Sequence, residues 1–157
     1  MENDINEYKY LFNNEEKRTT IIKEFEQKLN VYIQETEQKW KDEKIIVKNS
    51  PKFNEYTQKV LQDLQNLNNE LRKMSELKNE NFKKNVNFLL NLEQQNYKMT
   101  LSIYINKLNC FKLLKNDEDD CKLLQKEKEI ATMKTNLVGI REEINDFITN
   151  LKYKYLN

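Results

Sequence analysis

Histidine is absent from the sequence, and glycine, proline and tryptophan occur once each, as Gly139, Pro51 and Trp40. Without histidine, the chain lacks the usual proton shuttle at neutral pH and the commonest metal ligand. A single glycine excludes the glycine-rich loops that cradle phosphates, because these need several close backbone approaches. It also removes most tight turns between strands, so a hairpin-rich sheet is not expected. These absences point away from enzymes and toward a chain built of helices.

An excess of charge of either sign is also missing. Lys and Arg together number 27 and Asp and Glu number 26, which leaves a net charge of +1. Such a balance favours solubility but creates no field that would attract a polyanion. Only Arg18, Arg72 and Arg141 supply arginine, and lysine supplies the other basic residues. We interpret this abundance of lysine, together with that of asparagine, as the coding bias of an AT-rich genome.

Cys110 and Cys121 are the only thiols, and they cannot complete a zinc site without histidine or further cysteines. We expect them to be reduced and semi-buried, as is usual in an intracellular protein. The polar start, residues 1–4, does not resemble a signal peptide, and no apolar run approaches the roughly 20 residues of a membrane span. The sequence therefore predicts a soluble intracellular protein that has no cofactor and does not contact a membrane.

Apolar residues recur every three or four positions along most of the chain, which is the spacing of amphipathic helices. We predict one all-α domain over residues 1–157, with four long helices at about 4–44, 51–76, 82–114 and 119–155. The stripe of the last helix has no fault and consists of Ile130, Met133, Leu137, Ile140, Ile144, Phe147 and Leu151. Helices of this length with narrow stripes favour an elongated helical bundle or coiled coil.

Three polar segments separate the predicted helices. Ser50 can cap a helix whose first residue is Pro51, a position where the missing N–H costs nothing. The periodic pattern weakens over residues 75–85, where several asparagines are poor helix formers. The acidic run 117–120 is expected to cap the last helix, because a calcium loop would need alternating ligands and a glycine. Within the first helix, a loosening near residues 13–14 is an alternative to a continuous helix.

Neither the carboxylates nor the thiols of the sequence predict a reaction centre. Glu142 and Glu143 flank the stripe of the last helix and should face water, whereas acid–base catalysis requires buried carboxyl pairs. Cys110 and Cys121 have no histidine base that would activate them as nucleophiles. We therefore predict that the protein is not an enzyme, and we assign no catalytic, cofactor-binding or metal-binding residue.

Two short segments mix lysines with aromatic residues and are the candidate partner-contact sites. They consist of Trp40 and Lys41 in the first helix and of Lys152, Tyr153, Lys154 and Tyr155 in the last. Such a mixture can stack on single-stranded bases and touch phosphates. On a chain without a net basic charge this signal is weak, so direct nucleic-acid contact is not expected. The expected partners are other proteins bound through amphipathic helices, and homodimerisation stays open.

Four helical segments carry short motifs in a defined order. In the first helix they are Glu15 or Glu16 with Arg18, then Phe25-Glu26, then Tyr32. In the second and third they are Glu55 to Gln58, Leu92 to Gln95 and Met99-Thr100. In the fourth they lie between Ile140 and Lys152 and include Glu143-Ile144 and Phe147. This arrangement, from about residue 11 to residue 155, resembles the required-for-excision 1-B domain family.

The resemblance implies a small helical protein of nucleotide-excision or related DNA repair, nuclear and without catalysis. It supplies no established binding residues, so none is transferred to this sequence. The resulting hypothesis is a non-catalytic adaptor or scaffold that docks onto a repair or transcription complex by helix-in-groove packing. One rival is a structural coiled-coil subunit of a cytoskeletal, ciliary or trafficking assembly in the cytoplasm. Another is a single-strand nucleic-acid binder that uses the two lysine–aromatic segments.

Overall fold

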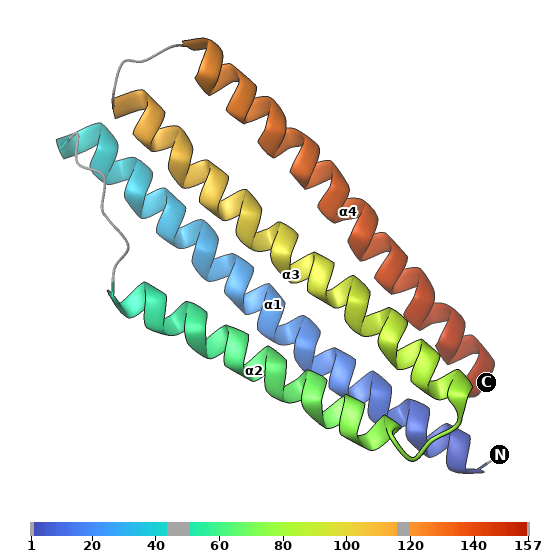
Figure 1. Ribbon diagram of the computed structural model, residues 1–157. Helices are drawn as coiled ribbons and strands as arrows, with labels where there is room; N and C mark the ends of the chain where they lie inside the picture. The colour runs from blue at the N-terminus through green and yellow to red at the C-terminus, as the bar shows by residue number, and fades with distance from the viewer. Residues whose placement is uncertain (1, 44–50, 116–119, 157) are drawn as a thin grey trace.

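The computed structural model describes residues 2–43, 51–115 and 120–156. They form four α-helices, which are α1 (Glu2–Glu43), α2 (Pro51–Ser75), α3 (Glu80–Lys115) and α4 (Asp120–Leu156). Successive helices run in opposite directions, so the start of α1 and the end of α4 lie at the same end of the bundle (Figure 1). The described part of the chain contains no strand, which confirms the predicted all-α bundle.

α1 and α3 form the centre of the bundle. Each of them contacts all three other helices, whereas α2 and α4 do not contact each other within the described residues. The most extensive contact joins α3 to α4, and the contact between α4 and α1 is much smaller. The α1–α4 seam is therefore more open than the α3–α4 seam, and the seam between α2 and α3 is similar to it in this respect.

Local chemistry determines where the helices begin and end. α2 begins at Pro51, as expected of a residue that has no N–H to donate. The turn between α2 and α3 falls at residues 76–79, inside the segment where the periodic pattern weakens. Asn79 caps α3, because its Oδ1 accepts a 2.8 Å hydrogen bond from the Phe82 N–H. The first and last residues of each described helix lie within two residues of the predicted bounds.

The other predicted caps, Ser50 and residues 117–119, lie outside the described residues. α1 continues through Asn14, so the alternative of a loosened helix is wrong. Asn14 is buried, and its Nδ2 donates a 3.0 Å hydrogen bond to the carbonyl oxygen of Leu67 on α2. Because the neighbouring helix satisfies this amide, it does not compete for the backbone of its own helix. Tertiary packing thus overrides the low helix propensity of asparagine.

Two apolar cores follow one another along the bundle. The core near the chain ends contains Tyr8, Leu11, Phe12, Leu71, Phe82, Val86, Leu89, Leu90, Leu92, Ile144 and Leu151. The core in the other half contains Ile22, Phe25, Leu29, Val60, Leu64 and Tyr104. A smaller cluster of Ile103, Ile130 and Leu137 extends the seam between α3 and α4. Each fully buried Leu or Phe side chain stabilises the fold by ~1.5–3 kcal/mol.

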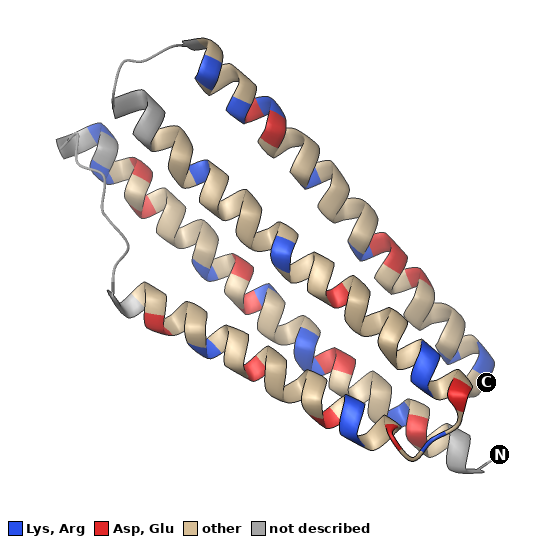
Figure 2. Cartoon of the chain, viewed as in Figure 1, with Lys and Arg blue, Asp and Glu red and all other residues tan. Residues whose placement is uncertain are grey.

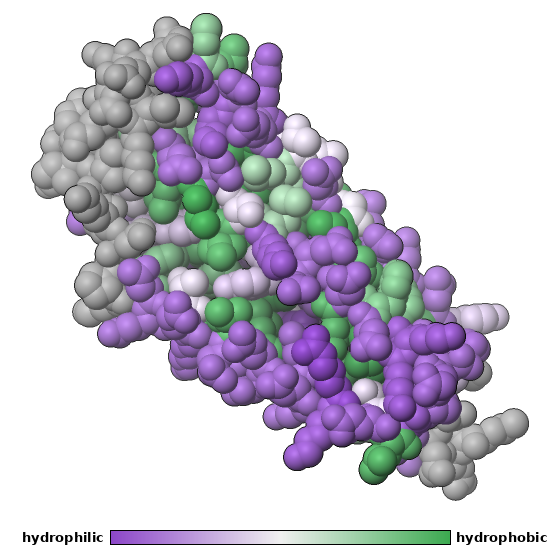
Figure 3. Space-filling view, viewed as in Figure 1, coloured by the Kyte–Doolittle hydropathy of each residue, from purple (hydrophilic) through white to green (hydrophobic). Residues whose placement is uncertain are grey.

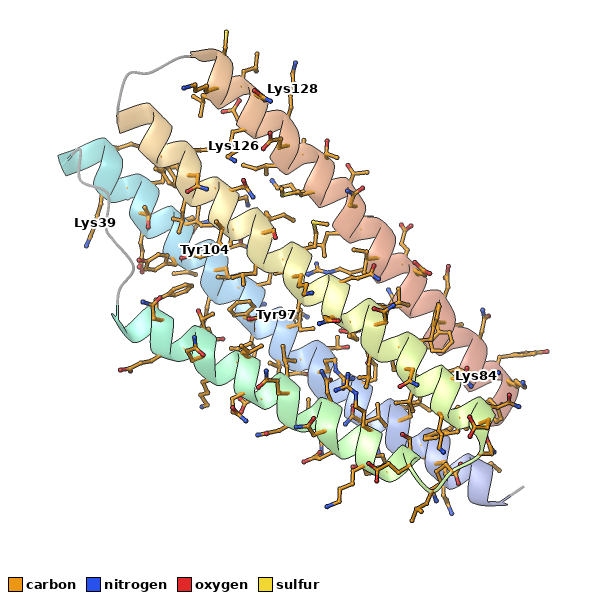
Figure 4. All side chains as sticks on the ribbon, viewed as in Figure 1. Lys39, Lys84, Tyr97, Tyr104, Lys126 and Lys128 are labelled. Atoms are coloured by element: carbon orange, nitrogen blue, oxygen red, sulfur yellow. The ribbon has the colours of Figure 1, made fainter. Side chains whose placement is uncertain are left out.

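Aromatic rings from three helices meet in the second core. Tyr97 and Tyr104 project from α3 into the bundle (Figure 4), where Tyr97 lies 5.9 Å from the Phe25 ring. Tyr104 lies 5.2 Å from the Phe53 ring of α2, which in turn stacks on Tyr32 of α1 at 4.4 Å. The Tyr104 hydroxyl is buried and has no hydrogen-bond partner among the described residues. Burial, and then the nearby Tyr32, raise the pKa of Tyr104 above its usual value.

The predicted stripe of α4 is confirmed. Ile130, Leu137, Ile144 and Leu151 are buried, and Met133, Ile140 and Phe147 are half-buried between them. The expectation for the thiols is only half right, because Cys110 is semi-buried but Cys121 is exposed. Cys121 lies in the first turn of α4, at a position off this stripe.

Basic and acidic residues are both distributed along the described helices (Figure 2). On the face seen in Figure 3, apolar patches are interrupted by hydrophilic side chains. None of the described helices combines the length and the apolar character needed to cross a lipid bilayer. The apolar faces of the helices instead pack mainly into the cores of the bundle.

Candidate functional site

The two predicted partner-contact segments lie at opposite ends of the bundle. Trp40 and Lys41 belong to the last turns of α1, and the second segment, from Lys152 to Tyr155, belongs to the last turns of antiparallel α4. A helix as long as α1 spans about 60 Å, so the fold does not bring the two segments together. The Trp40 side chain is outside the described part of the structure. Lys41 is exposed and forms a 3.2 Å ion pair with Glu37.

The second segment divides between internal and external side chains. Tyr155 stacks on Tyr8 of α1, with ring centroids 3.7 Å apart and an angle of 10° between the rings. The Lys152 ammonium lies 5.6 Å from the Phe12 ring, and that of Lys154 lies 5.2 Å from the Tyr155 ring. Tyr153, in contrast, is 76% exposed. Tyr155 therefore closes the end of the bundle, and Tyr153 is free to meet a partner.

A layer of polar side chains separates the two apolar cores, and sequence reasoning did not find it. We call this group the polar layer; its members are Asn14, Glu15 and Arg18 on α1, Asn68 on α2, Glu93, Asn96 and Thr100 on α3, and Arg141 on α4. Six of these eight side chains are buried, and those of Asn68 and Arg141 are half-buried. All four helices contribute, so the layer joins them at one level of the bundle.

Arg18 is the centre of the first half of the polar layer. Arg18 is 1% exposed, and its Nη1 donates a buried 2.8 Å hydrogen bond to Glu15 Oε2. Its Nη2 donates hydrogen bonds of 2.7 Å to Asn14 Oδ1 and 2.8 Å to Asn68 Oδ1. A guanidinium carries donors in a fixed planar fork, which allows one side chain to bind three partners.

Glu15 and Glu93 bring two carboxyl groups together across the interface between α1 and α3. Burial raises the pKa of Glu15 to about 9, the Glu93 carboxylate adds to this rise, and the Arg18 guanidinium opposes it. Glu15 Oε1 is buried and receives no hydrogen from any donor in the described structure. A proton held between the two carboxyl groups satisfies this oxygen, since two neighbouring buried carboxylates cannot both stay ionised. The raised pKa thus favours the protonated form of Glu15 at neutral pH.

Arg141 completes the polar layer from α4. Its Nε donates a 3.1 Å hydrogen bond to Asn96 Oδ1, and its Nη2 donates a 3.3 Å bond to Thr100 Oγ1. The same guanidinium forms an ion pair with Glu26 of α1, at 3.1 Å from Nη2 to Oε2. Because the α1–α4 seam is open, this pair is a bridge across it. Asn96 also donates a 3.5 Å bond to Glu93, which connects the two halves of the layer.

One signal in the sequence could have revealed the polar layer. Lysine serves nearly every exposed basic position, yet Arg18 and Arg141 both occupy this layer. In a lysine-rich chain, an arginine marks a place where several acceptors must be bound at once. The interruption of the α1 stripe between Phe12 and Ile22 is a second signal, because the missing apolar positions are where the layer crosses α1.

Three adjacent hollows follow the seam between α1 and α4, and we call them the α1–α4 groove. Their volumes are about 720, 230 and 360 Å³, from the chain ends inward. The first two share Lys23 and Ile144, and the second and third share Glu26 and Arg141. Lys152, one of the predicted contact residues, lines the first hollow.

Among the described residues, no three Cys, Asp or Glu side chains converge to hold a metal ion. Within the Glu15–Glu93 pair, Glu15 Oε2 accepts a hydrogen bond from Arg18 and Glu93 Oε2 accepts one from Asn96. No protein-family model, no curated protein and no solved structure matches this chain significantly. Function must therefore be inferred from the residues and their geometry.

Proposed function

We propose that this protein is a non-catalytic helical adaptor that acts in DNA excision repair by binding other proteins. The observation that carries the binding role is the open α1–α4 seam, with its 720 Å³ hollow, beside a polar layer whose groups are engaged within the fold. In such a bundle the buried polar side chains bind mainly to one another, and the α1–α4 seam stays accessible. This arrangement is suited to binding a partner rather than to catalysis.

The placement in excision repair depends on the resemblance of four sequence segments to the required-for-excision 1-B domain family. Several residues that carry this resemblance belong to the polar layer or bridge to it, namely Glu15, Arg18, Glu26, Glu93 and Thr100. A motif made of residues that hold the four helices together has a physical reason to recur in a related bundle. The location of these motif residues in the polar layer supports the resemblance. Exposed residues of amphipathic helices, in contrast, can match between unrelated proteins without any shared structural role.

Survival after ultraviolet irradiation tests the repair role. We expect a strain that lacks the gene to be hypersensitive to ultraviolet light and to regain resistance with the intact gene. Survival after heat shock is the control for general frailty, and it should not change. Normal survival of the gene-deleted strain under ultraviolet light would contradict the repair role.

A structural subunit of a cytoskeletal, ciliary or trafficking assembly is the second candidate. It is favoured by the length of the helices and by exposed apolar side chains on their outer faces, which include Val31, Leu124 and Tyr153. In this role the tagged protein should occur in the cytoplasm, and light scattering should detect self-association at micromolar concentration. A strictly nuclear, monomeric protein would exclude it.

A further inference from the structure

The rim of the α1–α4 groove is basic, although the whole chain is nearly neutral. The exposed charged residues that line the three hollows are the lysines Lys9, Lys23, Lys134 and Lys152 and the single carboxylate Glu16. The exposed acids Glu142 and Glu143 of α4 do not line the hollows. Positive charge is thus concentrated along one seam of a molecule whose net charge is only +1.

Two of the groove lysines lie so close together that they oppose each other. Lys107 on α3 and Lys134 on α4 line the same hollow. Burial, followed by the charge of Lys134, lowers the pKa of Lys107, and Glu26 opposes this effect only partly. An anionic side chain placed between the two ammonium groups would remove this repulsion, since opposite charges within about 4–6 Å favour the charged forms.

The floor of the groove is apolar on both sides of the Arg141–Glu26 bridge. Phe12, Ile144 and Ile148 line the first hollow, and Leu29, Ile33, Leu137 and Val138 line the third. From Lys9 to Ile33 the groove follows α1 for about 36 Å, which is the length of a helix of about 24 residues. An apolar floor between basic rims matches a helix that has an apolar stripe and acidic flanks.

We propose that the α1–α4 groove, with its rim of Lys9, Lys23, Lys134 and Lys152 over an apolar floor, binds an acidic amphipathic helix of a partner protein. This inference rests on the proposed protein-binding function and assigns it a surface. Nucleic acid shares the negative charge, but it would leave the apolar floor unused. Glu26 and Arg141 lie midway, where a polar residue of the bound helix can join their ion pair.

Selection from a displayed peptide library tests the proposal directly. The probe is a library of 24-residue helices with a fixed leucine stripe, whose flanking positions vary among Glu, Lys, Gln and Ser. We expect the full-length protein to select peptides with Glu at the flanks, because these pair with the lysine rim. The selected peptide should bind the double variant Lys23→Glu/Lys134→Glu at least about tenfold more weakly, since two attractive rim contacts become repulsive.

Matched controls separate the groove from the rest of the surface. Lys59→Glu/Lys73→Glu makes the same change of charge on exposed positions of α2, and it should leave peptide affinity within about twofold of the wild type. Val138→Glu should abolish binding, whereas Val31→Glu should not. These two valines are exposed to similar extents, 56% and 53%, but only Val138 lines the groove.

Several outcomes would overturn the proposal. They are the absence of any selected helix, the selection of basic flanks, and equal losses of affinity in the groove and control variants. Displacement of the selected peptide by a single-stranded DNA 30-mer would assign the surface to nucleic acid instead. If no peptide is selected but the gene-deleted strain is hypersensitive to ultraviolet light, only the groove proposal is rejected. Selected helices with normal ultraviolet survival would reject the repair role alone.

Discussion

Glu15 on α1 and Glu93 on α3 place their carboxyl groups against each other inside the bundle, and Arg18 donates a hydrogen bond to Glu15. The pair lies between two apolar cores, where an isolated carboxylate would be costly. A shared proton and one guanidinium reduce that cost, and the arrangement requires α1 and α3 to meet at one register. The polar layer thus specifies how the helices align, in addition to its contribution to stability.

The shared proton makes the stability of the protein depend on pH. Folded Glu15 keeps its proton up to about pH 9, whereas in the unfolded chain it loses the proton near its ordinary value of 4.5. Between these values the folded state binds more protons, so the free energy of unfolding falls as pH rises. We expect urea denaturation to give lower stability at pH 8 than at pH 5.5.

The variant Glu15→Gln should remove this dependence, because an amide can donate to Glu93 at every pH. We expect it to unfold at higher urea concentration than the wild type at pH 8 and to have a flatter pH profile. Glu16→Gln, on the exposed side of the same helix, is the control and should keep the wild-type profile. A wild-type free energy of unfolding that does not change from pH 5.5 to pH 8 would show that Glu15 holds no extra proton.

Arg18 should not tolerate replacement by lysine. A lysine ammonium cannot reach Glu15, Asn14 and Asn68 together, so buried acceptors would lose their donor. We expect Arg18→Lys to lower the free energy of unfolding by roughly 2–4 kcal/mol, measured by urea denaturation. Arg72→Lys changes an exposed arginine of α2 in the same way and should cost less than ~0.5 kcal/mol. Equal effects of the two substitutions would mean that the fork geometry of Arg18 is unimportant.

The regular parts of the fold could be predicted from the sequence because they depend on repeating local patterns. The stripe from Ile130 to Leu151 needs only its three- and four-residue spacing to predict both the helix and its buried face. The break before α3 followed from the asparagines near residue 79, one of which is its cap. These features involve neighbours in sequence, and no knowledge of the partner helix is needed.

The polar layer could not be predicted in the same way because its partners are distant in sequence. Arg18 and Asn68 are 50 residues apart, and Arg141 and Glu26 are 115 apart. A buried Asn14 or Glu93 looks like a surface residue until the helix that satisfies it is known. For the same reason the sequence could not show that Tyr155, one of the predicted contact residues, stacks on Tyr8. The groove arises from the unequal contacts of α4, which depend on the whole arrangement.

Removal of two buried tyrosine hydroxyls should change the stability of the protein in opposite directions. The Tyr104 hydroxyl is buried without a partner in the described structure, so Tyr104→Phe removes an unsatisfied group. We expect this variant to be more stable than the wild type by about 1 kcal/mol. The Tyr8 hydroxyl accepts a 2.7 Å hydrogen bond from Asn85 Nδ2, so Tyr8→Phe should be less stable by about the same amount. Thermal and urea unfolding of both variants would measure the two signs, and a loss of stability in Tyr104→Phe would contradict the burial of an unpaired hydroxyl.

The stripe of α4 should be the most sensitive part of the bundle to a buried charge. Leu137 and Ile144 are each 6% exposed and pack in different apolar clusters. Replacing either one with Asp would place a carboxylate among the buried apolar side chains of its cluster, at a cost of roughly 3–4 kcal/mol. We expect both variants to lose cooperative unfolding or to melt far below the wild type in circular dichroism.

Leu124→Asp supplies the control for these two variants on the same helix. Leu124 is 53% exposed, so the new carboxylate stays in water and the melting temperature should change by only a few degrees. The comparison separates the effect of burial from the low helix propensity of aspartate, which is common to all three variants. If Leu137→Asp and Ile144→Asp melted with Leu124→Asp, α4 would not be packed on α3 in solution, and the groove between α1 and α4 would lose one of its walls.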